Sequence, residues 1–318
     1  MDVNNPVFSA LLPVVLLIAT GAVAGRAGWI RGEAIKDLSN LVFMVLTPAL
    51  LFRTMSTVHV EQLNFQPVAL YFVAVLLLFA GMFLWQGMSR RAAVLALATT
   101  FSNTVMIGIP LIGLAYGQAG LVTLLTLISV HSLVLLTVAT VVLEMVTARE
   151  ARAAGQGVQQ HMVLTVLMAM KNGIIHPVPL PIIVGLLFAQ TGLTLPEVVD
   201  KPLNLLGNAL GPLALVLVGV TLMQVNVGPH LKYAISFSLL KNLLLPALVA
   251  TLGLILGMEG LPLTVMIVTA SLPIGANPFL FAHRYEVAQD LVTASMTVST
   301  ALGMATVTLV MSLVGLMA

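Results

Sequence analysis

Two short stretches interrupt long apolar runs of the chain: NTVMIGIP at residues 103–110 and SLPIGANP at residues 271–278. Each has a glycine shortly before a proline. Proline removes a helix hydrogen bond and glycine loosens the backbone, so both stretches predict a broken helix. A helix that restarts at such a break presents free N–H groups and a partial positive charge, which together favour the binding of an anion.

The composition predicts that these breaks lie inside a membrane. Of the 318 residues, 59% are hydrophobic and only 8% are charged, and the mean hydropathy is +1.10. A soluble domain carries about a quarter of its residues as Asp, Glu, Lys or Arg, so we expect an integral membrane protein. The chain has no cysteine, which excludes disulfides, thiolate chemistry and Cys-ligated zinc. No cofactor and no metal site are expected.

The apolar runs predict an all-α integral membrane fold of ten transmembrane helices, because about 20 apolar residues are needed to cross the hydrocarbon core. The N-terminal run has no basic residue before it and no cleavage site, so it is predicted to be a retained span. The expected spans are residues 7–25, 34–56, 67–87, 92–116, 119–147, 174–190, 200–224, 231–256, 262–282 and 288–316.

The positive charges predict the orientation of these spans, since Lys and Arg concentrate on the cytoplasmic side. Connections between spans alternate sides. The odd-numbered connections carry Arg26, Arg31, Lys36, Arg90, Arg91, Arg149, Arg152, Lys171, Lys232 and Arg284. The opposite side has only Arg53 and Lys201. Both termini should therefore face away from the cytoplasm, in a multi-pass protein of the inner (plasma) membrane.

One polar connection, TAREARAAGQGVQQH at 147–161, divides the chain into two halves of five spans. We expect a first repeat at 1–147, a cytoplasmic linker with an interfacial helix at 148–173, and a second repeat at 174–318. Because five is odd, the second half enters the membrane with the opposite orientation, which is the arrangement of a 5+5 inverted repeat. Each half also places an asparagine eight residues before a proline: Asn40 and Pro48, then Asn204 and Pro212.

The two broken helices are the fourth and the ninth, at matching positions of the two halves. Asn103 lies roughly 18 Å along its span from Arg91, near the middle of the membrane. Asn103, Thr104 and Asn277 would supply polar side chains at this depth, and Pro110 fits the first turn of a second half-helix. Two half-helix N-termini would then point at the membrane centre from opposite sides. The alternative is that the prolines merely kink packed helices.

These residues also carry a family resemblance. FSNTVMIGIPLIG at 101–113, and IVTASLPIGANPFLFAHRY at 267–285 followed by a hydroxyl-rich last span, resemble the auxin efflux carrier family, whose bacterial members include malonate and malate carriers. The resemblance covers nearly the whole chain. It implies a scaffold of spans 1, 2, 6 and 7, and a mobile transport domain of spans 3–5 and 8–10, in an elevator arrangement. It also implies a homodimer through the scaffold helices.

The resemblance further implies that the fourth and ninth spans cross at their breaks and that an organic anion binds beside the crossing. By motif position, Asn103, Pro110, Asn277 and Pro278 would belong to the site. The full set of predicted substrate-binding residues adds Thr104, Gly108, Gly275 and Lys241. The central loop is shorter than in the plant carriers and aromatic residues are few near the breaks. Both features favour a small aliphatic acid, with malonate as the first candidate substrate.

Two ionisable residues are expected deep within spans. Lys241 lies roughly 15 Å into the eighth span, where a charge is costly and faces the protein interior. It would attract the anion or replace a bound cation; alternatively, it caps the free carbonyls of the broken helices. His131, in the middle of the fifth span, is a candidate carrier of a coupling proton, because the unperturbed pKa of a histidine side chain lies close to neutrality. The alternative is a buried histidine bonded to a neighbouring hydroxyl.

The expected function is that of a secondary transporter of small organic anions working by alternating access. An enzyme is disfavoured, because the chain has no HExxH motif, no paired membrane aspartates and no cysteine. An anion-selective channel remains an alternative, since broken helices also build filters, as does an export carrier for an auxin-like monocarboxylate. The acidic ligands expected of a sodium site are missing from the span centres, which leaves proton symport, a backbone-liganded sodium ion or uniport. Of these three, proton symport is the preferred prediction.

Overall fold

The computed structural model describes residues 6–153, 164–165, 167–168, 170–171, 177–224 and 227–316. Most of the predicted linker at 148–173 lies outside these residues. The described chain is helical and contains no β-strand. Its α-helices are α1 (Pro6–Arg26), α2 (Gly32–Leu41), α3 (Thr47–Met55), α4 (Gln66–Trp85), α5 (Arg90–Ala98), α6 (Ile109–Ala153), α8 (Pro179–Gln190), α9 (Glu197–Leu222), α10 (Leu231–Leu239), α11 (Leu245–Ile255), α12 (Gly260–Ser271), α13 (Asn277–Arg284) and α14 (Gln289–Gly315).

Every predicted segment coincides with one of these helices or with a broken pair of them. Six helical stretches of the described chain are long and apolar enough to cross a membrane: Gly32–Met55, Gln66–Trp85, Thr104–Ala153, Glu197–Leu222, Gly228–Ile255 and Gln289–Gly315. Three apolar stretches are shorter, namely Leu11–Arg26, Pro179–Gln190 and Gly260–Ser271. The all-helical membrane fold is thus confirmed, while the crossing of the membrane by ten spans stays a prediction. The difference arises because the predicted fourth and ninth spans are broken, and because the stretches that correspond to the first and sixth spans, Leu11–Arg26 and Pro179–Gln190, are short.

Three of the membrane helices widen just before a proline. π-helical turns occupy Val42–Leu46, Thr104–Gly108 and Leu240–Leu244, and an α-helix follows each of them directly. Pro48, Pro110 and Pro246 stand at the second residue of these following helices. Proline lacks an N–H group and its ring crowds the carbonyl four residues earlier, so a wider turn at this point keeps the helix continuous.

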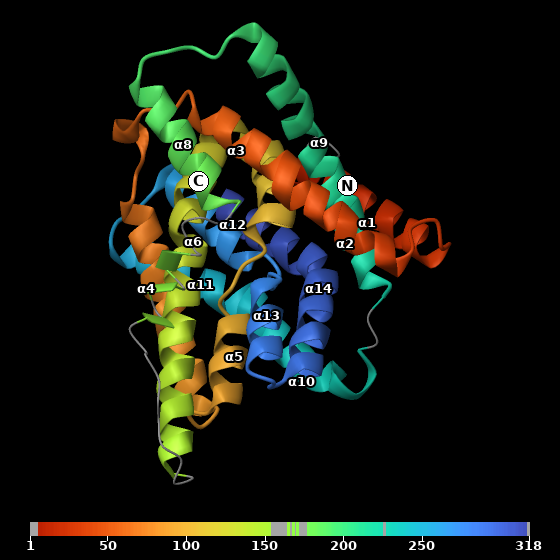
Figure 1. Ribbon diagram of the computed structural model, residues 1–318, viewed down its shortest axis with the longest axis vertical. Helices are drawn as coiled ribbons and strands as arrows, with labels where there is room; N and C mark the ends of the chain where they lie inside the picture. The colour runs from red at the N-terminus through yellow and green to blue at the C-terminus, as the bar shows by residue number, and fades with distance from the viewer. Residues whose placement is uncertain are drawn as a thin grey trace.

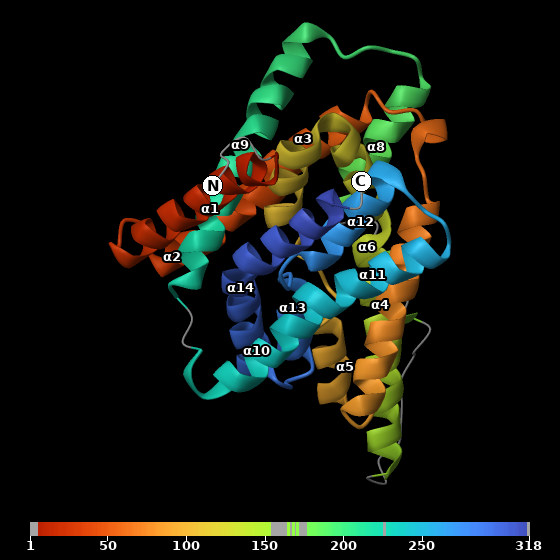
Figure 2. The same cartoon turned by 180° about the vertical axis from the view of Figure 1, so that it is seen from behind.

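The helices form two groups that lie side by side (Figures 1 and 2). In the first group α1 packs along α9, and α3 packs against α8 and α9. The approach of α1 to α9 is so close that a Cβ atom on Gly219 would overlap the backbone of Ile18. Such small residues at the contact are characteristic of helix packing in membranes. This first group contains the helices predicted for the scaffold.

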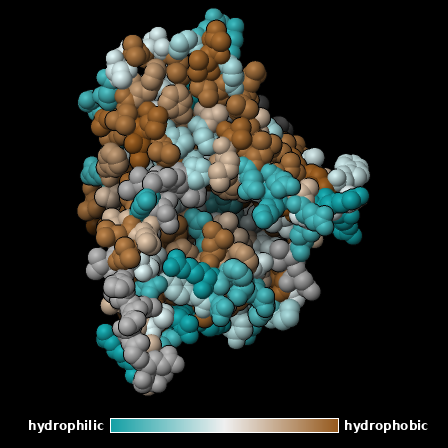
Figure 3. Space-filling view, viewed as in Figure 1, coloured by the Kyte–Doolittle hydropathy of each residue, from teal (hydrophilic) through white to brown (hydrophobic). Residues whose placement is uncertain are grey.

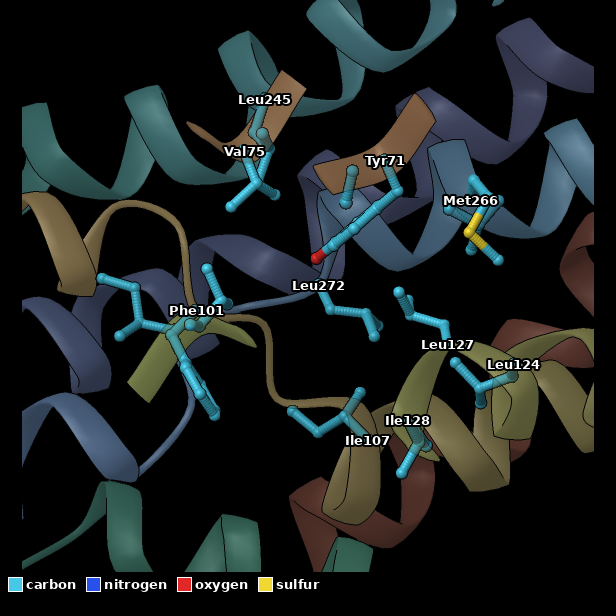
Figure 4. Close-up of a cluster of buried hydrophobic side chains, with 14 of the residues drawn as sticks. Tyr71, Val75, Phe101, Ile107, Leu124, Leu127, Ile128, Leu245, Met266 and Leu272 are labelled. Carbon is cyan, nitrogen blue, oxygen red and sulfur yellow. The ribbon is translucent and has the colours of Figure 1, made fainter. Parts of the chain in front are cut away.

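The second group consists of α4, α5, α6 and α10 to α14. Here α4 packs against α5 and α11, and α10 packs along α14. α6 bends sharply at Gly117, where φ is 60°, so that it supplies both the second half of the fourth predicted span and the whole of the fifth. Figure 4 shows part of the buried apolar cluster of this group, with Tyr71, Phe101, Ile128 and Leu272 gathered around the two points where helices are interrupted.

The two broken stretches cross and pair with each other. Between α5 and the π-turn that leads into α6, and between α12 and α13, short extended segments run antiparallel, with Ser102 opposite Ile274. The Asn103 N–H donates to the Pro273 carbonyl at 2.8 Å, and the Gly275 N–H donates to the Phe101 carbonyl at 2.9 Å. Each break therefore satisfies backbone groups that the other break has exposed.

The carbonyl ends of the two interrupted helices are satisfied by side chains. The Thr100 hydroxyl donates to the Ala96 carbonyl of α5 at 2.8 Å. At the end of α12, the Lys241 ammonium donates to the carbonyls of Ala270 and Leu272, both at 2.7 Å. Lys241 is completely buried. A single cation thus binds two carbonyls that have no place in the helix ladder.

The crossing is also fixed to α14. The Ser299 hydroxyl accepts a hydrogen bond from the Ile274 N–H at 3.0 Å and donates one to the Met296 carbonyl at 3.0 Å. The Asn242 amide, next to Lys241, donates to the Ser299 carbonyl at 2.9 Å. The crossing therefore belongs mechanically to the second helix group.

Replacing Lys241 by methionine should lower the stability of the protein. Lys241→Met keeps a long apolar side chain but leaves two buried carbonyls without a donor, and an unsatisfied buried polar group costs about 1–3 kcal/mol. The measurement is the thermal unfolding midpoint of the purified protein in detergent. Lys232→Met is the matched control, because Lys232 is exposed near the start of α10. Equal midpoints for the two variants would contradict the capping role.

Candidate functional site

A cavity of about 350 Å³ lies beside the crossing, between the two helix groups. Its walls come from both groups, and their centre is hollowed in the view of Figure 3. The first group contributes Ile35, Ser39, Phe43, Val178, Val218, Thr221 and Leu222. The second group contributes Phe101 to Met106, Ile128, His131, Ser132, Ile274 to Asn277, Thr293, Met296, Thr297 and Thr300. The volume suits a small organic molecule.

Five of the predicted site residues line this cavity. They are Asn103, Thr104, His131, Gly275 and Asn277. Residues from the two breaks, about 170 positions apart in the sequence, thus share one wall, as the anion-site hypothesis requires. The role of each in binding stays a prediction.

The polar groups of the first break are held in place and remain available. Asn103 caps the π-turn, because its Oδ1 accepts a hydrogen bond from the Met106 N–H at 3.3 Å; its amide nitrogen has no partner among the described residues. Thr104 is only 5% exposed, and its hydroxyl likewise finds no partner in the described chain. A buried hydroxyl that faces a cavity without a partner is ready to bind a ligand.

The second break offers backbone and amide groups. Asn277 begins α13, and its side chain makes no hydrogen bond within the described residues. Among the described residues, the N–H groups of Ala276 and Asn277 have no backbone acceptor, and neither has the Val105 N–H at the first break. Gly275 is required here by close packing, because a Cβ atom would lie 2.9 Å from the Phe101 ring and 3.1 Å from the Ser102 carbonyl oxygen.

The other predicted site residues lie outside the cavity wall. Gly108 lies against Leu272, Pro110 faces Gly211 of α9, and Pro278 is buried in the first turn of α13. They shape the half-helices that begin at the breaks rather than lining the cavity.

Lys241 also lies outside the wall, on the carbonyl side of the crossing. Its ammonium donates hydrogen bonds to the carbonyls of Ala270 and Leu272. This geometry matches the second role considered for Lys241, the capping of free carbonyls. In this position the ammonium would influence an anion by fixing the crossing rather than by direct contact.

His131 lines the cavity from α6 and is 1% exposed. Its Nε2 lies 3.4 Å from the Tyr71 hydroxyl, which is itself 3.0 Å from the Ser102 hydroxyl. The Phe101 ring stands edge-on to the imidazole, with centroids 4.7 Å apart. A hydrogen-bonded chain therefore joins His131 to the crossing. The hydroxyl beside it comes from α4 and not from its own helix.

Sequence reasoning missed two contributions to the site. Tyr71 gave no signal, because its partners are distant in the sequence. Thr293, Thr297 and Thr300 line the cavity from α14, and their spacing of four and three residues would have identified them as one helix face. Their hydroxyls donate to carbonyls one turn earlier in the same helix.

The electrostatics of the site follow from the direction of the broken helices. The amino ends of the half-helices beginning at Thr104 and Asn277 face the cavity, whereas the carboxyl ends of α5 and α12 do not line it. Helix amino ends carry a partial positive charge. Among the described residues, no three His, Asp or Glu side chains cluster as a metal site would need. The arrangement is chemically suited to bind a carboxylate.

Comparison with known proteins agrees with this geometry. A family model described as "Membrane transport protein" matches residues 6–311. A protein named "Putative malonate transporter" from Rhizobium meliloti is 27% identical over 306 residues, 94% of this chain and 92% of the relative. "Auxin efflux carrier component 8" of Arabidopsis thaliana is 23% identical over 231 residues, 61% of this chain and 63% of that protein. The chain therefore belongs to the membrane transport protein family of the auxin efflux carriers.

Proposed function

We propose that this membrane transport protein is a secondary transporter of small organic anions, with malonate as the first candidate substrate. The observation that carries the proposal is the pairing of the two broken stretches beside a cavity that lies between two helix groups. The relative named as a malonate transporter, which aligns along nearly the whole chain, supports the choice of malonate.

The proposed mechanism is alternating access by movement of one helix group along the other. The anion binds to the crossing, whose hydrogen bonds join it to α14 and Lys241. It therefore travels with the second group, while α1, α2, α3, α8 and α9 act as the scaffold. A shift of the second group would expose the same cavity to opposite sides in turn.

The proposed orientation places both termini outside the cytoplasm of the inner membrane, with ten spans in a 5+5 inverted repeat. Arg90 begins α5, Lys232 is in the first turn of α10 and Arg284 ends α13. Figures 1 and 2 show α5, α10 and α13 on the same side of the molecule. Hydrophilic residues gather on that side in Figure 3. The positive-inside rule assigns it to the cytoplasm. Dimerisation through the scaffold helices is part of the proposal.

The proposal is tested with a substrate panel in proteoliposomes. We expect malonate uptake that saturates and that shows counterflow, with malate and succinate as weaker competitors. Indole-acetate is included because a family relative is named as an auxin carrier; preferential transport of it would favour the export of an auxin-like monocarboxylate. Ohmic single-channel currents without counterflow would indicate an anion channel and overturn the proposal.

The two asparagines of the crossing provide the second test. Asn103→Ala and Asn277→Ala should each weaken malonate binding by about tenfold to a hundredfold, because a hydrogen bond to a charged group is worth about 1.5–3 kcal/mol. The dissociation constant is measured by calorimetry on purified protein. Asn208→Ala is the matched control, since Asn208 lies exposed on α9 and bonds only Asn204 among the described residues. Unchanged affinity in both crossing variants would place the site elsewhere.

Proton coupling is proposed, and His131, which lies in the cavity wall and contacts Tyr71, is the candidate side chain for it. Uptake should collapse when a protonophore is added at constant sodium concentration. His131→Gln tests whether this side chain carries the proton, because glutamine keeps a hydrogen-bonding group but carries no proton: transport by exchange only, with no response to a pH gradient, would assign the proton to His131. Uptake that follows the sodium gradient in both proteins would assign the coupling to sodium.

A further inference from the structure

The cavity beside the crossing has no charged side chain in its described lining, which is unusual for a site that binds a dicarboxylate. None of its described lining residues is Asp, Glu, Lys or Arg. The titratable groups nearest to it are His131 from α6, Tyr71 of α4 in contact with His131, and Lys241 behind the crossing. From α2, α8, α9, α13 and α14 the described lining contributes no titratable side chain.

The positive potential of the site comes from backbone groups. The half-helices that begin at Thr104 and Asn277 each present an amino end to the cavity. A helix amino end is equivalent to about half an elementary charge, so the two together balance roughly one negative charge. The free N–H groups of Val105 and Asn277, with the Asn103 amide, supply the matching donors.

Lys241 is not among the residues that line the cavity. Its ammonium binds the carbonyls of Ala270 and Leu272, where the carboxyl end of α12 carries a partial negative charge. The cation and the helix end thus compensate each other on the far side of the paired segments. The site is left with backbone donors for a single carboxylate.

The remainder of the cavity is suited to an uncharged group. Ile35, Phe43, Val218, Leu222 and Met296 form an apolar wall. A second carboxylate placed there would lose its hydration and gain no cation, which is unfavourable. The wall also contains Ser39 and Thr221, but the Thr221 hydroxyl already donates to the Leu217 carbonyl, which leaves the neutral Ser39 hydroxyl as a donor. A protonated carboxyl group has no such penalty. Thr104 lines the cavity and makes no side-chain hydrogen bond among the described residues, so its hydroxyl can accept this proton.

We propose that this site recognises its substrate as a singly charged anion, so that malonate is bound and moved as hydrogen malonate. The proposal rests on the proposed function, and it defines the charge class of the substrates: monocarboxylates and half-protonated dicarboxylates bind, while dianions are rejected. A proton then crosses the membrane with each malonate on the substrate itself.

The test compares malonate with monomethyl malonate, whose single carboxylate stays singly charged when malonate loses its second proton. Dissociation constants are measured on the purified protein from about pH 5 to about pH 8. Above the second pKa of malonic acid, malonate binding should weaken about tenfold for each pH unit. Monomethyl malonate binding should stay flat, with an affinity similar to that of hydrogen malonate.

His131→Gln separates protonation of the ligand from protonation of the protein. In this variant the pH slope for malonate should persist, because the slope arises from the ligand. Parallel slopes for both ligands that disappear in His131→Gln would overturn the proposal and assign the pH dependence to His131. Malonate binding that is independent of pH, with no binding of the monoester, would overturn it in favour of a dianion site while leaving the proposed function intact. Binding of neither ligand would instead remove malonate as substrate.

Discussion

The structure depends on one constraint: backbone N–H and carbonyl groups inside a membrane must find partners within the protein. Breaking a helix there exposes several such groups at once. The chain meets the constraint by placing two breaks together, so that the segment Phe101–Asn103 pairs with Pro273–Gly275. Neither break would be tolerable without the other. The crossing is therefore a requirement of the backbone before it is a binding site.

The same geometry separates the two kinds of exposed helix end. Carbonyl ends are satisfied internally, at α5 by threonine hydroxyls and at α12 by Lys241. Amino ends face the cavity, where several N–H groups have no acceptor in the described chain. Water molecules in the cavity could accept hydrogen bonds from these N–H groups, and so can the oxygens of a carboxylate. The site favours an anion because the carbonyl ends of the interrupted helices are hydrogen-bonded within the protein, whereas the amino ends are left open to a ligand.

Much of this arrangement could be predicted from the sequence. The apolar runs predicted the helices, and the matching glycine–proline stretches predicted both breaks. Asn103 and Asn277, which these stretches contain, both line the cavity. Contacts between distant residues were out of reach. Nothing local to Tyr71 indicates that it meets Ser102 and His131. The depth of Lys241 was predictable, but its choice of carbonyls over the cavity depends on the direction of the crossing, which spacing alone does not set.

The polar bonds around the crossing are distributed unevenly between the two helix groups, and this bears on the proposed movement. Ser299 and Lys241, both of the second group, bond directly to the crossing segments. Across the cavity the first group presents mainly apolar side chains, such as Phe43 and Val218, with the hydroxyls of Ser39 and Thr221. Sliding apolar surfaces past each other breaks few hydrogen bonds, whereas tearing the crossing from α14 would leave buried groups unpaired. A rigid displacement of the whole second group is therefore the motion that this pattern of bonds favours.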